Sequence, residues 1–245
     1  MARGRIRAAR RVSSVAVMND VVLSPPPSPL LPGRRAGGWT FLREAARDLR
    51  TTGAVAPSGR ALARVLTEPV RAARGPRPLS VLEAGAGTGA VTRVLLARLP
   101  GDGELDIVEA NPRFAAGLDR LAAAYRAGPG GRAGRVAVHR GLVEEFGAGR
   151  RYDVIVSGLP LTNFAPLQVE RIMARYLELL RPGGTLSYFA YLGTGAARSL
   201  LASRAEARRH AAVEEVMAGY QRRYGVARWR VWANLPPAGA WHLRR

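Results

Sequence analysis

The sequence has no cysteine and no lysine, so its 38 basic residues are all arginine. Without cysteine, disulfides and thiolate metal sites are excluded, and the three scattered histidines predict no metal centre. No apolar run approaches the roughly 20 residues needed to cross a bilayer, so any membrane contact is expected to be peripheral. Only 18 residues are acidic, and the formal net charge is +20. This excess predicts an anionic partner, either nucleic acid or an acidic membrane surface.

Residues 1–38 differ in composition from the rest of the chain. A basic start, the proline-rich stretch "SPPPSPLLPG" and a closing "RRAGG" predict a disordered leader, followed by a single domain over residues 39–245. Arg10 and Arg11 precede a short apolar run and faintly resemble a twin-arginine export signal. Polar residues interrupt that run, and no cleavage site is clear, which disfavours export.

Residues 39–52 have the spacing of an amphipathic helix. Trp39 belongs to its apolar face, and three arginines line another face, namely Arg43, Arg47 and Arg50. The pattern fits a helix that packs on the domain core and equally a helix that lies on a membrane surface. Ser58 is placed to cap the next helix.

The strongest local signal is "SVLEAGAGTGAVTRVLL", in which an apolar strand leads through three glycines into an amphipathic helix. This is the strand, turn and helix of a nucleotide-binding unit. Glu109 lies 20 residues beyond Gly89, at the end of the next strand, where an acid accepts hydrogen bonds from ribose hydroxyls. Glu83, beside the glycines, suits a cationic amino-acid group better than a pyrophosphate. These features favour S-adenosyl-L-methionine over a dinucleotide as the cofactor.

Two later segments complete the fold prediction. "RYDVIVSGLP" predicts a fourth strand that ends in a loop at the carboxyl edge, and "LRPGGTLSYF" predicts a turn into a fifth strand. Together with the glycine motif, they indicate an α/β, Rossmann-like class I methyltransferase fold. The expected sheet has seven strands, mostly parallel, with helices on both faces.

The loop at residues 157–161 bears on the substrate. Enzymes that methylate a planar amino group gain from an Asn or Asp acceptor and a stacking ring, but here Ser157 is the available acceptor and Leu161 stands where the ring would be. A flexible alkylamine needs instead to lose its proton and its water and to approach the sulfonium methyl in line. The loop therefore predicts an aliphatic amine substrate.

The chain resembles the bacterial phospholipid N-methyltransferases, which methylate phosphatidylethanolamine. The resemblance rests on "GAVAPSGRALA", "VLEAGAGTGAVTRVLL", "VSGLPLTNF", "LRPGGTLSYFAY" and "NLPPA" and covers residues 39–192 and 227–243. It implies methylation of the phosphatidylethanolamine headgroup and its mono- and dimethyl derivatives towards phosphatidylcholine. It also implies a cytoplasmic enzyme, bound peripherally to the inner face of the cell membrane through the basic helix at residues 39–52.

The expected site residues fall into three groups. Those for the cofactor are Glu83, Gly85, Gly87, Thr88, Gly89, Glu109, Ala110, Leu142, Val143 and Ser157. Those for catalysis are Ser157, Leu159 and Tyr191. Those for the substrate or the membrane are Trp39, Arg43, Arg47, Arg50, Ser58, Gly158, Pro160, Leu161, Tyr188 and Asn234. Leu142 departs from the family, whose members often carry an acid near the adenine amine.

Two of these expectations leave alternatives open. Strand alternation puts Tyr188 on one face and Phe189 and Tyr191 on the other, so at least one ring belongs to the core. Tyr191, at the strand end, is favoured as the ring that contacts a methylated ammonium. Asn234 either forms a rigid wall of the site or belongs to a turn between strands.

Other function classes remain possible. An rRNA or tRNA base methyltransferase would explain the positive charge, but it should carry the polar, aromatic loop that is missing here. A small-molecule N- or O-methyltransferase and a non-catalytic membrane adaptor are the further alternatives.

Overall fold

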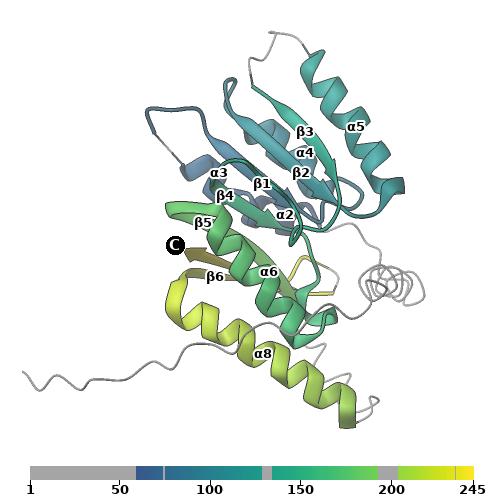
Figure 1. The fold of residues 1–245 in the computed structure, drawn as a ribbon, viewed down its shortest axis with the longest axis vertical. Helices are drawn as coiled ribbons and strands as arrows, with labels where there is room; N and C mark the ends of the chain where they lie inside the picture. Colours follow the sequence, from purple (N-terminus) through teal and green to yellow (C-terminus); the bar gives the residue numbers. More distant parts are fainter. Residues whose placement is uncertain (1–58, 74, 129–133, 193–203, 235) are drawn as a thin grey trace, which may run out of the picture. The chain divides into compact units, whose positions relative to one another are not determined.

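The computed structural model describes residues 59–73, 75–128, 134–192, 204–234 and 236–245 (Figure 1). All of them lie in a compact unit that spans Gly38–Arg245. The predicted leader, the basic helix at residues 39–52 and Ser58 lie outside the described residues. Within the described part, no helix combines the length and the apolar character needed to span a bilayer.

A seven-stranded sheet forms the centre of this unit, in the order β3-β2-β1-β4-β5-β7-β6 (Figure 1). Its strands are β1 (Ser80–Ala84), β2 (Glu104–Glu109), β3 (Val136–Arg140), β4 (Tyr152–Ser157), β5 (Leu180–Tyr191), β6 (Gly225–Val231) and β7 (Ala238–Arg244). Strands β1 to β5 pair in parallel, whereas β7 runs antiparallel between β5 and β6. The predicted fold class is confirmed, including the mostly parallel sheet.

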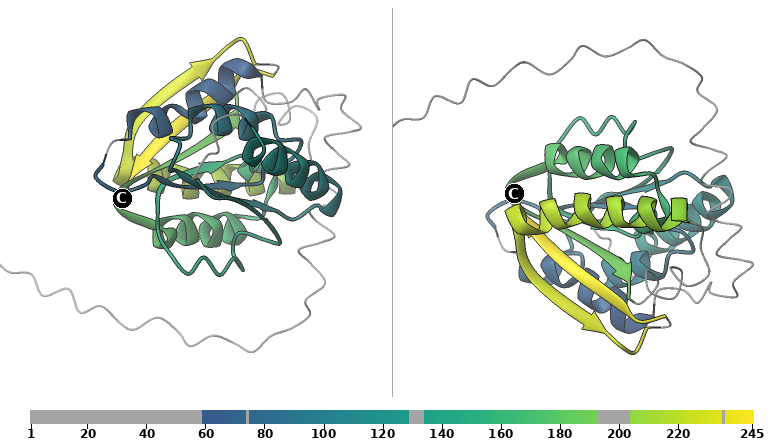
Figure 2. Two further views of the ribbon diagram at one scale, coloured as in Figure 1. Left: turned by 90° about the horizontal axis from the view of Figure 1, so that it is seen from above. Right: turned by 90° about the horizontal axis from the view of Figure 1, so that it is seen from below.

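Helices cover both faces of the sheet (Figure 2). They are α2 (Arg60–Leu66), α3 (Glu68–Ala72), α4 (Ala90–Arg98), α5 (Pro112–Arg126), α6 (Pro166–Leu179) and α8 (Arg204–Tyr224), with a short 3₁₀ helix η1 (Leu161–Asn163). One core cluster unites the sheet with α2, α4 and α5, and a second unites it with α6 and α8. Every residue of β1 is buried because helices cover it on both sides.

Local sequence sets where the helices begin at the carboxyl edge of the parallel strands. α4 starts after Gly89, which has a φ of +79°. α5 starts after Asn111, whose side chain accepts a hydrogen bond from the Arg113 N–H, and Pro112 takes the first helical position. Helix N-termini therefore face the edge where the predicted cofactor motifs end.

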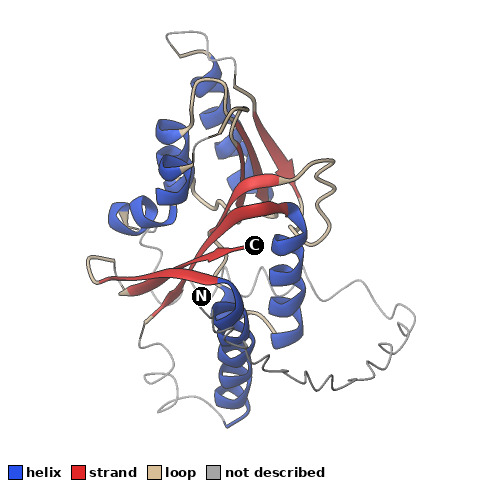
Figure 3. Ribbon diagram, turned by 90° about the vertical axis from the view of Figure 1, so that its left-hand side faces the viewer, coloured by secondary structure: helices blue, strands red, loops and turns tan. Residues whose placement is uncertain are grey.

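The turn between β6 and β7 lies at the same edge, because Ala238 at the start of β7 pairs with Tyr191 at the end of β5 (Figure 3). Asn234 is buried in this turn. Its Oδ1 accepts the Gly59 N–H at 2.7 Å, and its Nδ2 donates to the Pro236 carbonyl at 2.7 Å. The side chain thus joins the turn to the start of α2. Asn234 belongs to a turn between strands, and that turn borders the carboxyl edge.

Candidate active site

The loop from β1 to α4 is held in a conformation that glycine favours. Gly85, Gly87 and Gly89 have φ angles of 72°, 54° and 79°, in the left-handed region that other residues rarely adopt. A Cβ on Gly85 would also lie 2.3 Å from Cδ2 of Leu159. The loop therefore brings bare backbone to the carboxyl edge, as a nucleotide-binding turn requires.

A second loop, from residues 157–161, packs directly on the glycine loop. The Gly158 N–H donates to the Ala84 carbonyl at 2.8 Å. A Cβ on Gly158 would lie only 2.4 Å from the Gly85 carbonyl oxygen. With Leu159 against Gly85, the two loops that the sequence motifs predicted meet at one place.

Replacing Gly158 by alanine should disturb this contact. We expect Gly158→Ala to destabilise the domain by about 1–3 kcal/mol, because the added methyl must push the Gly85 backbone away. Gly147→Ala is the matched control, since its added Cβ would meet no heavy atom within 4 Å. Urea unfolding measures both variants, and equal losses of stability would show that the close approach at Gly158 is not what matters.

Glu109 is buried at the end of β2. Its Oε2 accepts the Gly87 N–H at 2.8 Å, and its Oε1 accepts the Asn111 N–H at 2.7 Å. Burial raises the pKa of Glu109, and the backbone N–H donors, led by that of Asn111, oppose the increase. A carboxylate has about four acceptor sites, so the backbone donors leave acceptor capacity for a hydroxyl group. The predicted ribose ligand therefore also fastens the glycine loop.

Glu83 is fully buried in β1. Its Oε2 accepts a hydrogen bond from the Thr92 hydroxyl at 2.7 Å, whereas its Oε1 has no partner among the described residues. Burial raises the pKa of Glu83 to about 8, although the hydrogen bond from Thr92 acts in the opposite direction. A buried oxygen without a donor is costly. The described residues thus leave this oxygen unsatisfied, and an ammonium group would satisfy it.

The chemistry of these residues fits S-adenosyl-L-methionine. The unpaired oxygen of Glu83 suits its amino group, and the remaining acceptor capacity of Glu109 suits its ribose hydroxyls. At Gly87 an added Cβ would meet no heavy atom within 4 Å, so the loop leaves open space there. The acceptor oxygens of Glu83 and Glu109 and the open space at Gly87 thus lie along the carboxyl edge of the sheet.

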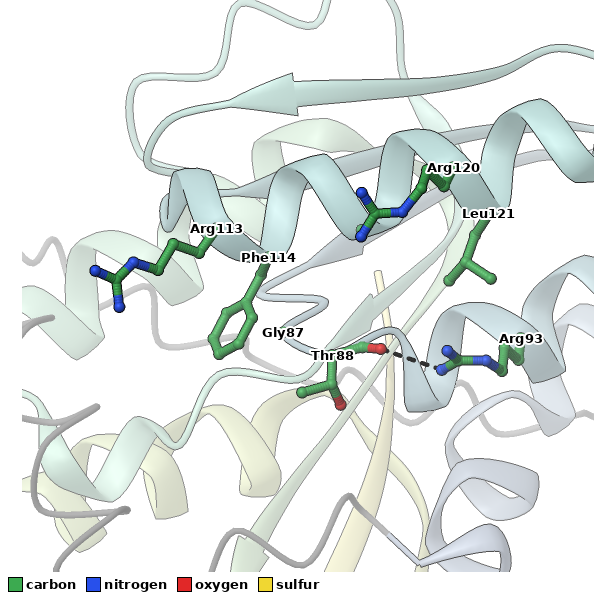
Figure 4. A pocket seen from close by; sticks show the side chains of 8 residues that line it. Gly87, Thr88, Arg93, Arg113, Phe114, Arg120 and Leu121 are labelled. Atoms are coloured by element: carbon green, nitrogen blue, oxygen red, sulfur yellow. Dashed lines mark hydrogen bonds between the residues drawn. The ribbon is translucent and has the colours of Figure 1, made fainter.

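A cavity of about 410 Å³ lies beside the glycine loop, between α4 and α5 (Figure 4). It is lined by Gly87, Thr88, Arg93, Arg113, Phe114, Gly117, Arg120 and Leu121. Arg93 donates to the Thr88 and Gly89 carbonyls at 3.1 and 2.9 Å, so it stabilises the loop. The sequence prediction missed Arg93 and Thr92, although both follow the glycines within the first turn of α4.

The structure corrects three of the predicted roles in the substrate loop and in β5. Ser157 is buried, and its Oγ accepts hydrogen bonds from the Tyr176 hydroxyl at 2.9 Å and the Leu159 N–H at 3.3 Å. Leu161 is fully buried in the core on the α6 side, so it does not present its side chain to a substrate or a membrane. Tyr188 is also core, stacked on Trp241 with ring centroids 5.6 Å apart.

The remaining predicted residues lie at or near the carboxyl edge. Tyr191 is partly buried at the end of β5, with its ring edge-on to Phe189 at 5.2 Å. Ala110, Leu142 and Pro160 are partly buried in the loops after β2, β3 and β4, whereas Val143 is buried in the α6-side core. Tyr191 remains the predicted ring for a methylated ammonium.

The fold and the site together define the architecture of a class I, Rossmann-like methyltransferase. Residues 81–184 match the family model described as "Methyltransferase domain". The cofactor that the sequence predicted, S-adenosyl-L-methionine, agrees with this match and with the acceptors that Glu83 and Glu109 provide.

Among curated proteins, the chain is similar to an ornithine lipid N-methyltransferase from Singulisphaera acidiphila. The two are 34% identical over 108 residues, which is 44% of this chain and 55% of that protein. The chain thus matches about half the length of this relative.

Solved structures extend the likeness in fold. One is the 1,6-didemethyltoxoflavin-N1-methyltransferase of Burkholderia thailandensis, with a TM-score of 0.57 and 19% identity, covering 90% of this chain and 93% of that one. Another is the N-methyltransferase NodS of Bradyrhizobium japonicum, with a TM-score of 0.52 and 17% identity, covering 84% and 97%. At these identities the likeness concerns the fold.

Proposed function

We propose that this chain is an S-adenosyl-L-methionine-dependent N-methyltransferase that acts on the headgroup amine of phosphatidylethanolamine and its mono- and dimethyl derivatives. The observation that carries the proposal is the contact between the glycine loop and the loop at residues 157–161. The acceptor amine would meet the cofactor at this contact, and Leu159 gives it an apolar surface.

The chain's own residues would hold the cofactor at the carboxyl edge of the sheet. Glu83 would accept from the ammonium through its unpaired oxygen, and Glu109 would accept from the ribose hydroxyls. When bound, the cofactor supplies a sulfonium methyl that an amine lone pair can attack.

The substrate loop would act by excluding water rather than by supplying a base. The Ser157 hydroxyl already accepts from Tyr176 and from the Leu159 N–H, and residues 157–161 contain no acid, amide or histidine. An aliphatic ammonium has a pKa near 10, and removing its water lowers that pKa, so that it gives its proton to solvent as it enters the site and exposes its lone pair. This chemistry suits an alkylamine and disfavours the planar amino group of a nucleic-acid base.

A second substrate is favoured by the similarity to an ornithine lipid N-methyltransferase. The ornithine side chain carries an aliphatic amine, as the ethanolamine headgroup does, so the same loop chemistry serves both. An ornithine lipid is therefore the alternative headgroup within the same reaction class. Peripheral binding to the inner face of the cell membrane, with the basic helix at residues 39–52 as one contact, is part of the proposal for either lipid.

Methyl transfer from labelled S-adenosyl-L-methionine tests the proposed function. We expect label in phosphatidylethanolamine when the full chain meets vesicles containing it, with products resolved by mass spectrometry. Vesicles with an ornithine lipid, free ethanolamine and RNA are parallel acceptors. Label that enters the ornithine lipid alone would move the assignment to the second substrate. Label in RNA or free ethanolamine, with none in lipid, would overturn the proposal.

A further inference from the structure

Strand β6 forms an outer edge of the sheet, and β7 is the one described strand that pairs with it (Figure 3). Its side chains are mostly exposed. Trp229 is 37% exposed, and Trp232, directly after the strand, is 67% exposed. A sheet edge with exposed tryptophan calls for an explanation, because such surfaces commonly mark binding sites.

The charged side chains at this end of the chain are all positive. Residues 225–245 contain three of the four tryptophans of the chain, and they contain four arginines and no acidic residue. Arg228 lies over the Trp241 ring at 5.1 Å, whereas Trp229 contacts the His242 ring at 4.2 Å. Since Trp241 and His242 are adjacent in β7, alternation places Arg228 and Trp229 on opposite faces of the sheet. The edge therefore combines cationic and aromatic groups.

The end of β6 lies at the same carboxyl edge of the sheet as the candidate active site. Val231 pairs with Ala238, which pairs with Tyr191 at the carboxyl end of β5. Trp232 follows Val231, and Asn234 joins the same turn to the start of α2. A partner surface bound at Trp232 would thus lie at the carboxyl edge of the sheet, where the glycine loop and the substrate loop meet.

We propose that Arg228, Trp229, Arg230 and Trp232, here termed the β6 edge surface, dock on an anionic lipid bilayer. Tryptophan favours the headgroup region, and arginine is attracted to anionic lipid. A second copy of the chain is a poorer occupant, because pairing of two β6 edges would bring like charges together. The choice of a lipid surface over nucleic acid rests on the proposed function, since docking here presents the lipid amine to the site.

Vesicle flotation of the full chain tests this surface, with phosphatidylcholine vesicles that contain or lack phosphatidylglycerol. Arg228→Gln with Arg230→Gln should weaken binding to the anionic vesicles by about 10- to 30-fold at low salt, and much less in 0.5 M salt. Trp232→Ala should weaken binding by roughly 3- to 10-fold at both salt concentrations, since its contribution is apolar.

Matched controls come from other surfaces of the domain. Arg126→Gln with Arg171→Gln removes two exposed arginines from α5 and α6, and Leu167→Ala removes a side chain that is 59% exposed. The controls should bind vesicles as the wild type does. Wild-type vesicle binding by the β6 variants, or losses as large in the controls, would overturn the docking surface. The docking surface would also be overturned if the β6 variants lost self-association or RNA binding but bound vesicles normally.

A soluble substrate separates this inference from the proposed function. On short-chain phosphatidylethanolamine below its micelle concentration, the β6 variants should methylate at the wild-type rate while their activity on vesicles falls. If the wild type methylates no lipid but the β6 variants still lose vesicle binding, the docking surface stands and the proposed function fails. If the wild type methylates lipid and the β6 variants bind vesicles normally, the proposed function stands and the docking surface fails.

Discussion

Glu109→Ala is expected to weaken the binding of S-adenosyl-L-methionine by about 1.5–3 kcal/mol, which is roughly 10- to 150-fold. Two losses contribute to this effect. The ribose hydroxyls lose a charged acceptor, and the Gly87 N–H loses the carboxylate that now holds it at 2.8 Å. The second loss leaves the glycine loop less well ordered before the cofactor arrives, so part of the binding energy must restore it.

Calorimetric titration measures this affinity, with Glu145→Ala as the control, because Glu145 is an exposed acid in the loop after β3. Amide exchange at Gly87 in the free protein separates the two contributions. Faster exchange with unchanged affinity would mean that Glu109 orders the loop but that the ribose is bound elsewhere. Unchanged affinity and exchange in a folded variant would remove Glu109 from the cofactor site.

The glycine loop was predictable because its function constrains its backbone. Left-handed φ angles and a Cβ position 2.3 Å from a neighbouring side chain leave little choice but glycine at residue 85. The acid at the end of β2 was predictable for a similar reason, since strand order and spacing fix where it lies. Such short-range patterns carried the fold class and the conformation of the glycine loop.

The substrate side was less predictable because its residues are defined by distant partners. Ser157 was expected to face the acceptor, but Tyr176 of α6 donates to its hydroxyl. Alternation separated Tyr188 from its neighbours in β5, but it did not reveal that Trp241 and Gln221 enclose this ring on the α8 side.

Leu161 shows the practical consequence. Its position in the motif predicted contact with the substrate, so Leu161→Asp would be an obvious test of amine chemistry. Because the side chain is fully buried, that aspartate would put a charge in the core and would test folding. Leu159, which contacts Gly85, is the residue of this loop that can report on the acceptor.

Glu83 is expected to make the stability of the free domain fall as pH rises. Its carboxyl has a pKa of about 8 when folded, against 4.5 for an unperturbed glutamate in the unfolded chain. Below pH 4.5 both states hold the proton. Between pH 4.5 and 8 the unfolded state loses it first, so unfolding becomes more favourable, and above pH 8 the loss is constant. The full effect is on the order of 5 kcal/mol, since each pKa unit corresponds to about 1.4 kcal/mol.

Glu83→Gln should remove this slope, because the amide does not titrate. His242 works in the opposite direction: burial lowers its pKa to about 4, so it adds stability as pH rises from about 4 to 6.5. The quantity to measure is therefore the difference in the free energy of unfolding between Glu83→Gln and the wild type, obtained by urea unfolding from pH 5 to 8.5. A difference that stays constant across this range would show that Glu83 is already ionised in the folded domain.

The same proton tests the cofactor assignment. If the ammonium of S-adenosylhomocysteine occupies the unpaired oxygen of Glu83, the positive charge lowers the pKa of Glu83 and the carboxyl must release its proton on binding. At pH 7 a group of pKa about 8 is mostly protonated, so binding should release most of one proton. Calorimetry in buffers of different ionisation enthalpy measures this release, and Glu83→Gln should abolish it. Binding without proton release in the wild type would separate Glu83 from the ammonium and leave it as a buried neutral acid that orders α4 through Thr92.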